Sequence, residues 1–304
     1  MKLKDNRQEH WIDLIPRAGE EDHKYTRGQV FVAGGRDMTG AACLAADAAA
    51  KAGAGLVNIV VLRLKFHEII NPHIIDPLPV YKGFRPYIIT RRCPDIVALL
   101  CQAQIKGRAV GVIGPGLGSN DYKEIRRIIL HALEGSCGQP VIPIVLDADG
   151  LNAFGGDAYR AHLYRAVHSS AVLTPHDGEF KKLFPSLSSL LKDNREKAAY
   201  DAAQMLDGGV LVLKGHNTII AQQADGEVHM VVNNVTSPYL ATAGSGDVLS
   251  GVIAGLMAQG MPAFQAGAAG VWIHGKAAQN IGLGLVAADL IDNIPEVLKE
   301  MLGI

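Results

Sequence analysis

Short apolar runs alternate with longer helix-like stretches along most of the chain. The apolar runs predict strands at residues 29–33, 56–62, 109–113, 144–146, 171–173 and 210–213. The longer stretches predict helices at residues 39–52, 120–133, 194–206, 247–259, 263–281 and 287–301, and a further helix after the loop at residues 174–180. Because strands that are apolar throughout are buried on both faces, this alternation predicts an α/β protein with a mostly parallel sheet between two layers of helices.

Two parts of the chain depart from this alternation. Asp225-Gly226 separates two shorter apolar runs, at residues 218–221 and 228–232, and such a dipeptide is typical of a tight hairpin. An antiparallel pair is therefore expected at one edge of the sheet. Residues 63–104 are interrupted repeatedly by proline, so loops and short helices are expected there. The chain contains no internal repeat and no linker rich in proline, serine or charge, so a single domain over residues 1–304 is expected.

The composition narrows the classes of function. The chain has 304 residues, a formal net charge of −1 and 48% hydrophobic residues, which is enough apolar material for a sizeable core. The near-neutral charge argues against nucleic-acid binding, because contacts with phosphate backbones need a basic face. The four cysteines form no C-x-x-C pair, so neither a structural metal nor a disulfide framework is expected. The N-terminus lacks the apolar segment of a signal peptide and no stretch is long enough to span a membrane, so a cytoplasmic location is expected.

The most distinctive loop is Gly244-Ser245-Gly246-Asp247, which leads directly into an apolar helix. Glycines let the backbone bend so that consecutive N–H groups point at one anion, and the helix N-terminus adds partial positive charge. A carboxylate beside an anion site is unfavourable unless it takes part in the chemistry. Asp247 is therefore a candidate base for a hydroxyl that attacks a phosphoryl group, with the glycine turn as anion hole. The structural alternative is that Asp247 only caps the helix.

Loops that follow parallel strands collect at one edge of the sheet, where ligands bind. Residues 114–118 read GPGLG, whose glycines do not match the dinucleotide fingerprint, so a ligand contact and a simple tight turn both remain open. In the next such loop, Asp147 and Asp149 lie on one side of an extended strand end. They are candidates for orienting a hydroxyl or holding hydrated Mg²⁺, with Asp149 expected nearer the ligand. The alternative for Asp149 is a helix N-cap.

Two more loops at this edge carry ionisable side chains. In TPHDGEF, His176 follows a parallel strand and is a candidate binding residue, although a lone histidine is usually structural. Glu179 in the same loop either caps the next helix or holds magnesium through water. In KGHNT, Lys214 is a candidate phosphate partner, although the loop is not a Walker A motif. The alternative for Lys214 is an exposed side chain on a strand-end turn.

Taken together, these motifs resemble the ADP/ATP-dependent NAD(P)H-hydrate dehydratase family, a branch of the ribokinase-like superfamily. The resemblance is carried in family order by HKYTRG, GGRDMTGAACLAADAAAKAGAGLV, GPGLG, LDADGLN, TPHDGE, KGHNT and ATAGSGDVLSG. It implies a ribokinase-like three-layer α/β/α fold, with a mostly parallel central sheet and an antiparallel edge hairpin.

The resemblance also implies a repair reaction on hydrated nicotinamide cofactors. Family members restore NADH and NADPH from the S epimers of NADHX and NADPHX, by phosphorylating the ring hydroxyl and then eliminating phosphate. Bacterial members typically use ADP and release AMP and phosphate, eukaryotic members typically use ATP, and Mg²⁺ is required. The implied partner is a separate NAD(P)HX epimerase, because the segment before the first motif is too short for a fused one. The implied assembly is a homo-oligomer, often a tetramer.

Site residues follow from the resemblance by position. It makes Asp247 the base that activates the substrate hydroxyl, with the anion hole formed by Gly244, Ser245 and Gly246. It implies nucleotide contacts from Lys214, Gly215, His216, Asn217, Thr218 and Gly246. It implies contacts with the hydrated nicotinamide from Ala41, Gly116, Gly118, His176 and Asp247, with Asp149 and Asn152 as further contributors. Glu179 remains the candidate magnesium residue.

Three other functions match parts of the same pattern. A ribokinase-like kinase of a small vitamin-precursor alcohol explains GSGD equally well, but not the combination of GPGLG, LDADGLN, TPHDGE and KGHNT. A catalytically silent nucleotide-binding sensor on this fold is disfavoured by the intact Asp247. An NAD-dependent dehydrogenase would need the Rossmann fingerprint, which is absent. The sequence therefore favours the dehydratase and leaves open ADP against ATP, and NADHX against NADPHX.

Overall fold

The computed structural model describes residues 3–36, 38–62, 76–93, 95–119, 121–135 and 141–304. The strands are β1 Leu3–Asp5, β2 Gln29–Gly34, β3 Leu56–Leu62, β4 Ile88–Cys93, β5 Ala109–Ile113, β6 Ile144–Leu146, β7 Ala171–Leu173, β8 Val210–Leu213, β9 Thr218–Ala224 and β10 Glu227–Asn233. The helices are α1 Thr39–Lys51, α3 Leu78–Lys82, α4 Ile96–Lys106, α5 Tyr122–Glu134, α6 Asp149–Asn152, α7 Asp157–Ala166, α8 Asp177–Leu183, α9 Ser188–Asp193, α10 Arg195–Leu206, α11 Ser245–Ala258, α12 Ala263–Ile281 and α13 Ala287–Leu302. Of the helices in these ranges, none is both long enough and apolar enough to cross a membrane.

The strands form one sheet in the order β1-β10-β9-β8-β7-β6-β5-β2-β3-β4. Every neighbouring pair from β8 to β4 is parallel, as the alternation of strands and helices predicted. The carboxyl ends of these strands therefore lie at one edge of the sheet, and the loops that follow them meet there.

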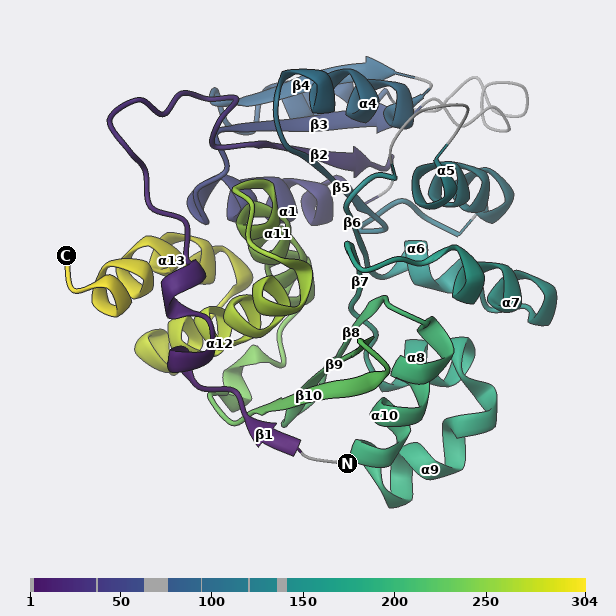
Figure 1. Ribbon diagram of the computed structural model, residues 1–304. Coiled ribbons are helices and arrows are strands. Elements are labelled where there is room, and N and C mark those ends of the chain that lie inside the picture. The colour runs from purple at the N-terminus through teal and green to yellow at the C-terminus, as the bar shows by residue number, and fades with distance from the viewer. Residues whose placement is uncertain (1–2, 37, 63–75, 94, 120, 136–140) are drawn as a thin grey trace.

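Helices cover both faces of the sheet (Figure 1). Helices α1, α11, α12 and α13 lie on one face, and α4, α5, α7, α8 and α10 lie on the other. Successive side chains of a strand point to opposite faces, so β2 contributes to both cores. Val30 and Val32 pack in the core under α1 and α11, whereas Phe31 and Ala33 pack in the core under α4 and α5. The predicted three-layer α/β/α architecture is confirmed.

The predicted hairpin forms between β9 and β10. Asp225 and Gly226 both have positive φ, 53° and 78°, which is the backbone geometry of a two-residue hairpin turn. The antiparallel pairing is confirmed, but the hairpin is not the edge of the sheet. The short strand β1 pairs parallel with β10, with Leu3 opposite Met230, and extends the sheet by one strand.

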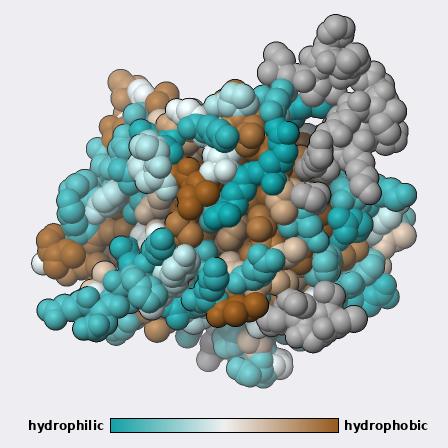
Figure 2. All heavy atoms as spheres, turned by 90° about the horizontal axis from the view of Figure 1, so that it is seen from above, coloured by the Kyte–Doolittle hydropathy of each residue, from teal (hydrophilic) through white to brown (hydrophobic). Residues whose placement is uncertain are grey.

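The expectation of loops and short helices at residues 63–104 holds for the five-residue helix α3 and the turns after it, but not for the rest of the range. Residues 63–75 lie outside the described residues, but the remainder holds the six-residue strand β4 and the eleven-residue helix α4. Strand β4 lies at the edge of the sheet and only Ile88 in it is buried, so its sequence lacks the apolar run that marks an inner strand. Helix α4 begins at a cap, since the Asp95 carboxylate accepts from the Val97 and Ala98 N–H groups. The surface at the β4 end of the sheet carries mostly hydrophilic side chains around smaller hydrophobic patches (Figure 2).

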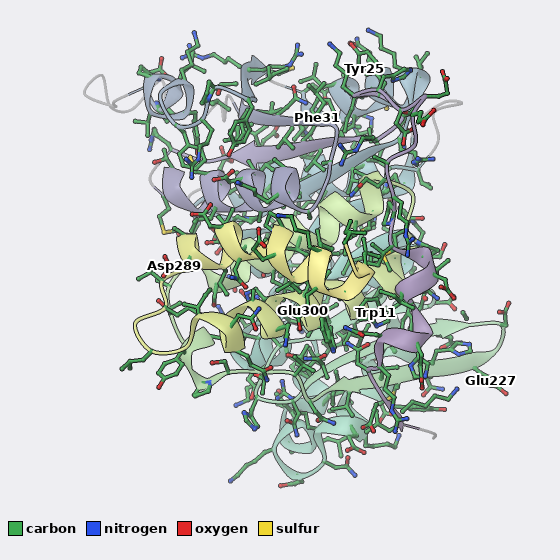
Figure 3. The ribbon with its side chains drawn as sticks, turned by 90° about the vertical axis from the view of Figure 1, so that its left-hand side faces the viewer. Trp11, Tyr25, Phe31, Glu227, Asp289 and Glu300 are labelled. Atoms are coloured by element: carbon green, nitrogen blue, oxygen red, sulfur yellow. The ribbon has the colours of Figure 1, made fainter. Side chains whose placement is uncertain are left out.

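The N-terminal segment crosses the face formed by α12 and α13 (Figure 3). Trp11 is buried there and meets Trp272 of α12 edge to face, with ring centroids 5.8 Å apart. The Trp11 indole N–H donates to the Asn6 amide oxygen at 2.9 Å, and the Asn6 amide nitrogen donates to Asn233 of β10 at 2.9 Å. These contacts fasten α12 to the end of β10, two elements that also line the candidate site.

Candidate active site

The Gly244–Asp247 turn begins helix α11 at the loop edge of the sheet. Gly244 is the N-cap residue and has φ +88°, a left-handed conformation that favours glycine. A Cβ on Gly244 would also lie only 2.5 Å from the end of the Leu44 side chain of α1, which would have to move. Within the described residues, the backbone N–H groups of Gly246 and Asp247 have no hydrogen-bond acceptor. The turn therefore presents two open donors at the positive end of a helix.

Asp247 lies in the first turn of α11 but does not cap it. Gly244 occupies the N-cap position, and the Asp247 carboxylate accepts no hydrogen bond from any residue that the structure describes. Burial raises the pKa of the Asp247 carboxyl to about 7, the nearby Asp147 carboxylate adds to the increase, and Lys214 opposes it. A base with a pKa near neutral pH is suited to take a proton from a hydroxyl. The capping alternative for Asp247 is therefore wrong.

Lys214 and Asp147 form a buried ion pair beside this turn. The Lys214 Nζ lies 2.7 Å from Asp147 Oδ1 and 3.8 Å from Glu179 Oε2, and Ser250 of α11 donates to Asp147 Oδ2 at 2.8 Å. Burial lowers the pKa of Lys214, but the Asp147 and Glu179 carboxylates outweigh burial, so the pKa is raised overall. A Cβ on Gly246 would lie 3.4 Å from Lys214 Nζ. The cation therefore stays charged next to the open N–H groups.

The two aspartates after β6 have different surroundings. Asp147 is 2% exposed and belongs to the Lys214 pair. Asp149 is the first residue of α6, and its Oδ2 accepts from the Gly118 N–H at 2.8 Å. Ala148 is the N-cap of α6, with φ 46°, so the N-cap alternative for Asp149 is wrong. Of the two, it is Asp147 that the structure places against Lys214, whereas the sequence favoured Asp149 as the residue nearer the ligand.

His176 and Glu179 form a capping box at the start of α8. The His176 Nδ1 accepts from the Gly178 and Glu179 N–H groups, and Glu179 Oε2 accepts from the His176 N–H at 2.9 Å. Glu179 is therefore a cap, as one of the two alternatives predicted, and its Oε2 also faces Lys214. Burial raises the pKa of Glu179, and Lys214 opposes the shift. The imidazole of His176 is 59% exposed and borders the cavity.

A cavity of about 540 Å³ opens beside these groups. Five of the six residues expected to contact a nucleotide line it, namely Lys214, Gly215, His216, Thr218 and Gly246. Asn217 lies in the same turn but does not line the cavity, and Ser245 does. His176, which the resemblance assigned to the hydrated nicotinamide, lines this same cavity.

Most of the remaining cavity wall was not foreseen from the sequence. It comes from the end of β10 and the segment after it, from α11 and from α12, and consists of Asn233, Val235, Thr236, Ser237, Pro238, Leu240, Ala241, Leu249, Val271, His274 and Gly275. Gly275 is required because a Cβ there would lie 1.9 Å from the Val235 carbonyl oxygen. Such close approach between a helix and a loop depends on residues 40 positions apart, which no local pattern reveals.

The residues expected on the substrate side form a second group. A Cβ on Gly116 would lie 2.3 Å from the Met38 carbonyl oxygen and 3.1 Å from the Ala41 Cβ, so these positions are in contact. Gly118 joins them through its hydrogen bond to Asp149. Asn152 is held differently, since its Oδ1 accepts from Lys182 Nζ at 2.8 Å.

The family model described as NAD(P)H-hydrate dehydratase matches residues 30–297. A bifunctional NAD(P)H-hydrate repair enzyme of Moorella thermoacetica is 34% identical over 94% of this chain and 52% of its own length. An ADP-dependent (S)-NAD(P)H-hydrate dehydratase of Neisseria meningitidis is 33% identical over 89% of this chain and 85% of its own length. The chain therefore spans about half the length of the bifunctional relatives and most of the length of the Neisseria protein.

Solved structures support the same assignment. The ADP/ATP-dependent NAD(P)H-hydrate dehydratase of Bacillus subtilis, co-crystallised with ATP and Mg²⁺, superposes with a TM-score of 0.73, 26% identity and 99% coverage of both chains. A ribokinase-like superfamily protein of Enterococcus faecalis superposes with a TM-score of 0.76 over 98% of this chain and 96% of its own, and its 21% identity supports the fold alone. The ribokinase-like fold is confirmed. Because the family model covers most of the sequence and relatives match it nearly end to end, the chain belongs to the NAD(P)H-hydrate dehydratase family.

Proposed function

We propose that the protein dehydrates (S)-NADHX and (S)-NADPHX to NADH and NADPH at the expense of a nucleotide, with ADP converted to AMP and phosphate. The observation that carries the proposal is the Asp247 carboxylate, whose pKa is raised to about 7 beside two open N–H groups. The named substrates of the Neisseria and Moorella relatives supply the substrate class.

The reaction follows from the placement of this base. Asp247 takes the proton of the ring hydroxyl, the oxygen attacks the terminal phosphorus of ADP, and the bond to AMP breaks. The N–H groups of Gly246 and Asp247 donate to the phosphoryl oxygens as charge develops on them. The carbon–oxygen bond then breaks, phosphate leaves with the bonding electrons, and the neighbouring ring carbon loses a proton. Hydrate and ADP thus give reduced cofactor, AMP and phosphate, and the atoms balance.

The residues around the base take supporting roles in this proposal. Lys214 supplies a fixed positive charge next to the transferred phosphoryl group, because Asp147 holds its ammonium beside Gly246. The KGHNT turn, including Asn217, contacts the rest of the nucleotide. The nicotinamide side consists of Ala41, Gly116, Gly118, Asp149, Asn152 and His176 together with Asp247.

The donor set fits Mg²⁺ that arrives with the nucleotide. No group of three or more His, Cys, Asp or Glu side chains in the described ranges could hold a metal alone. Mg²⁺ is commonly bound by one or two carboxylates together with substrate phosphates and water, so a complete protein cage is not needed. Glu179, whose carboxylate lies 3.8 Å from the ammonium of Lys214, is the residue that would hold it through water. Bound there, Mg²⁺ would neutralise charge on the phosphates.

We further propose that the protein works as a homo-oligomer, a tetramer, and alongside a separate epimerase. The epimerase would convert the R hydrates into the S hydrates that the proposed reaction consumes. Light scattering on the purified protein measures the assembly, and a monomer would overturn that part of the proposal.

The test mixes the purified protein with (S)-NADPHX, Mg²⁺ and either ADP or ATP and follows the near-ultraviolet absorbance of the reduced nicotinamide. We expect the absorbance to rise only when nucleotide is present, and faster with ADP. The same mixtures are analysed for AMP, which should form in equal amount to NADPH. No rise with either nucleotide, from folded protein that still binds ADP, would refute the dehydratase, and phosphorylation of a small alcohol in its place would support the kinase.

A further inference from the structure

A buried histidine on α12 contacts the backbone of the anion-hole turn. His274 is only 7% exposed, and its Nε2 lies 2.9 Å from the backbone carbonyl oxygen of Ser245, the first residue of α11. The same side chain lines the 540 Å³ cavity, between Val271 and Gly275 on one face of α12. No motif in the sequence singled it out.

The contact with Ser245 determines which ring nitrogen carries the proton. A carbonyl oxygen can only accept a hydrogen bond, so Nε2 must be the donor. Burial lowers the pKa of His274 to about 4, the Ser245 carbonyl opposes the shift and the positive charge of Lys214 adds to it, so the ring is neutral at pH 7. A neutral imidazole has one N–H, and Nδ1 therefore carries a lone pair and acts as an acceptor.

This Nδ1 acceptor is open to the cavity. None of the described residues donates a hydrogen bond to Nδ1, and yet Nδ1 is not fully enclosed by the protein. Since the rest of the side chain is buried, the accessible side of Nδ1 faces the cavity that His274 lines. A ligand that fills the cavity with no donor at this point would leave the lone pair desolvated and unpaired, which is unfavourable.

We propose that His274 determines nucleotide specificity by accepting, through Nδ1, a hydrogen bond from a ribose hydroxyl of the bound nucleotide. The inference rests on the proposed function, which places a nucleotide in this cavity. Ser245 belongs to the turn that binds the transferred phosphoryl group, and the imidazole lies directly against Ser245. The part of a nucleotide that adjoins its phosphates is the ribose, whereas the side chains of Leu240 and Leu249 provide apolar surface for the base.

The test is a binding cycle that needs no turnover. Titration calorimetry with Mg²⁺ measures the affinity of the wild type for ADP, 2′-deoxy-ADP, 3′-deoxy-ADP and inosine diphosphate. The loss of one neutral hydrogen bond should weaken binding roughly fivefold, so we expect one of the two deoxy analogues to bind that much more weakly than ADP. His274→Phe, which keeps a ring but removes both nitrogens, should bind ADP and that analogue equally. His229→Phe, the same change at an exposed position of β10, should leave the wild-type ratio intact.

Two conservative variants separate ribose recognition from support of the Ser245 carbonyl. The Oδ1 of asparagine lies close to the position of the histidine Nδ1, so His274→Asn should retain the preference for ADP over the deoxy analogue. The amide nitrogen of glutamine lies closer to the position of Nε2, so His274→Gln should keep the contact with Ser245 but lose the preference. If His274 only supported the fold, His274→Gln would retain the preference for ADP better than His274→Asn, or neither variant would change the ratio of the two affinities.

Each outcome decides a different point. If His274→Phe keeps the wild-type ratio of ADP to both deoxy analogues, the inference is overturned. If His274→Phe instead removes a wild-type preference for ADP over inosine diphosphate, Nδ1 contacts the amino group of the base. The ribose assignment is then overturned. If the wild type binds no ADP at all, it is the proposed function that fails, which the titration distinguishes from the other results.

Discussion

Replacing Asp147 by asparagine tests the buried pair that orients Lys214. Asp147 is 2% exposed and its carboxylate lies 2.7 Å from the Lys214 ammonium, so Asp147→Asn leaves a mostly buried cation without its main partner. Loss of one partner of a buried pair typically costs about 3–5 kcal/mol. Lys214 keeps Glu179 at 3.8 Å, so we expect a loss of about 3 kcal/mol, at the low end of that range.

The assay compares the urea unfolding of the wild type with that of two variants, each of which loses one negative charge. Asp149→Asn is the matched control, because Asp149 accepts one hydrogen bond, from the Gly118 N–H, and an asparagine oxygen can still accept it. Its expected loss is under about 1 kcal/mol. Equal losses in Asp147→Asn and Asp149→Asn would refute the reasoning, since they would show that Lys214 does not depend on the buried partner.

The same variant has a second consequence in the pH profile. The Asp147 carboxylate is one of the groups that raise the pKa of Asp247, so Asp147→Asn should lower it. The acid limb of kcat/KM, which reports the free enzyme, lies near pH 7 in the wild type if Asp247 is the base, and should move to lower pH in the variant. An unmoved limb in a folded, active variant would contradict the electrostatic account.

Three further predictions concern neighbouring residues. Asp247→Asn should abolish turnover but retain ADP binding. Because the folded pKa is raised from 3.8 to about 7, ionisation of Asp247 removes stability as pH rises, so the variant should be the more stable protein at pH 8, by up to about 4 kcal/mol in urea unfolding. Gly244→Ala should cost about 1–3 kcal/mol and most of the activity, because φ is +88° and the Cβ would lie 2.5 Å from Leu44; unchanged stability would mean that the turn adapts. Glu179→Gln keeps an acceptor for the His176 N–H, so thermal stability should change little while the Mg²⁺ concentration for half-maximal activity rises; an unchanged Mg²⁺ requirement would remove Glu179 from the metal site.

The order of inner strands and helices could be predicted because each carries its own signal. The inner strands are short apolar runs, and the hairpin is marked by Asp225-Gly226, which adopts positive φ at both positions. Strand β4 was missed because it lies at the sheet edge and is mostly exposed, and β1 because three residues give no pattern until they pair with β10. Elements that depend on a distant partner leave little trace in their own sequence.

The residues of the candidate site likewise include some with a local sequence signal and some that depend on a distant partner. Lys214 and His176 stand in short distinctive loops after strands, and Asp247 in a glycine turn that begins a helix, so their convergence at one sheet edge could be inferred from the sequence. Asp147 was named as a candidate, but not as the partner of a lysine 67 positions away. His274 lies inside an Ala- and Gly-rich helix, and only the crossing of α11 and α12 brings it to Ser245. Neither pairing can be read from local sequence.

The most direct test of the central claim follows one oxygen atom. (S)-NADPHX is prepared with ¹⁸O in its ring hydroxyl and incubated with the protein, Mg²⁺ and ADP, and the released phosphate is examined by ³¹P NMR. If Asp247 activates that hydroxyl to attack ADP, the ¹⁸O must appear in the inorganic phosphate, one atom for each NADPH formed. Unlabelled phosphate, with ¹⁸O released as water, would show that the hydroxyl is never phosphorylated and would contradict the account.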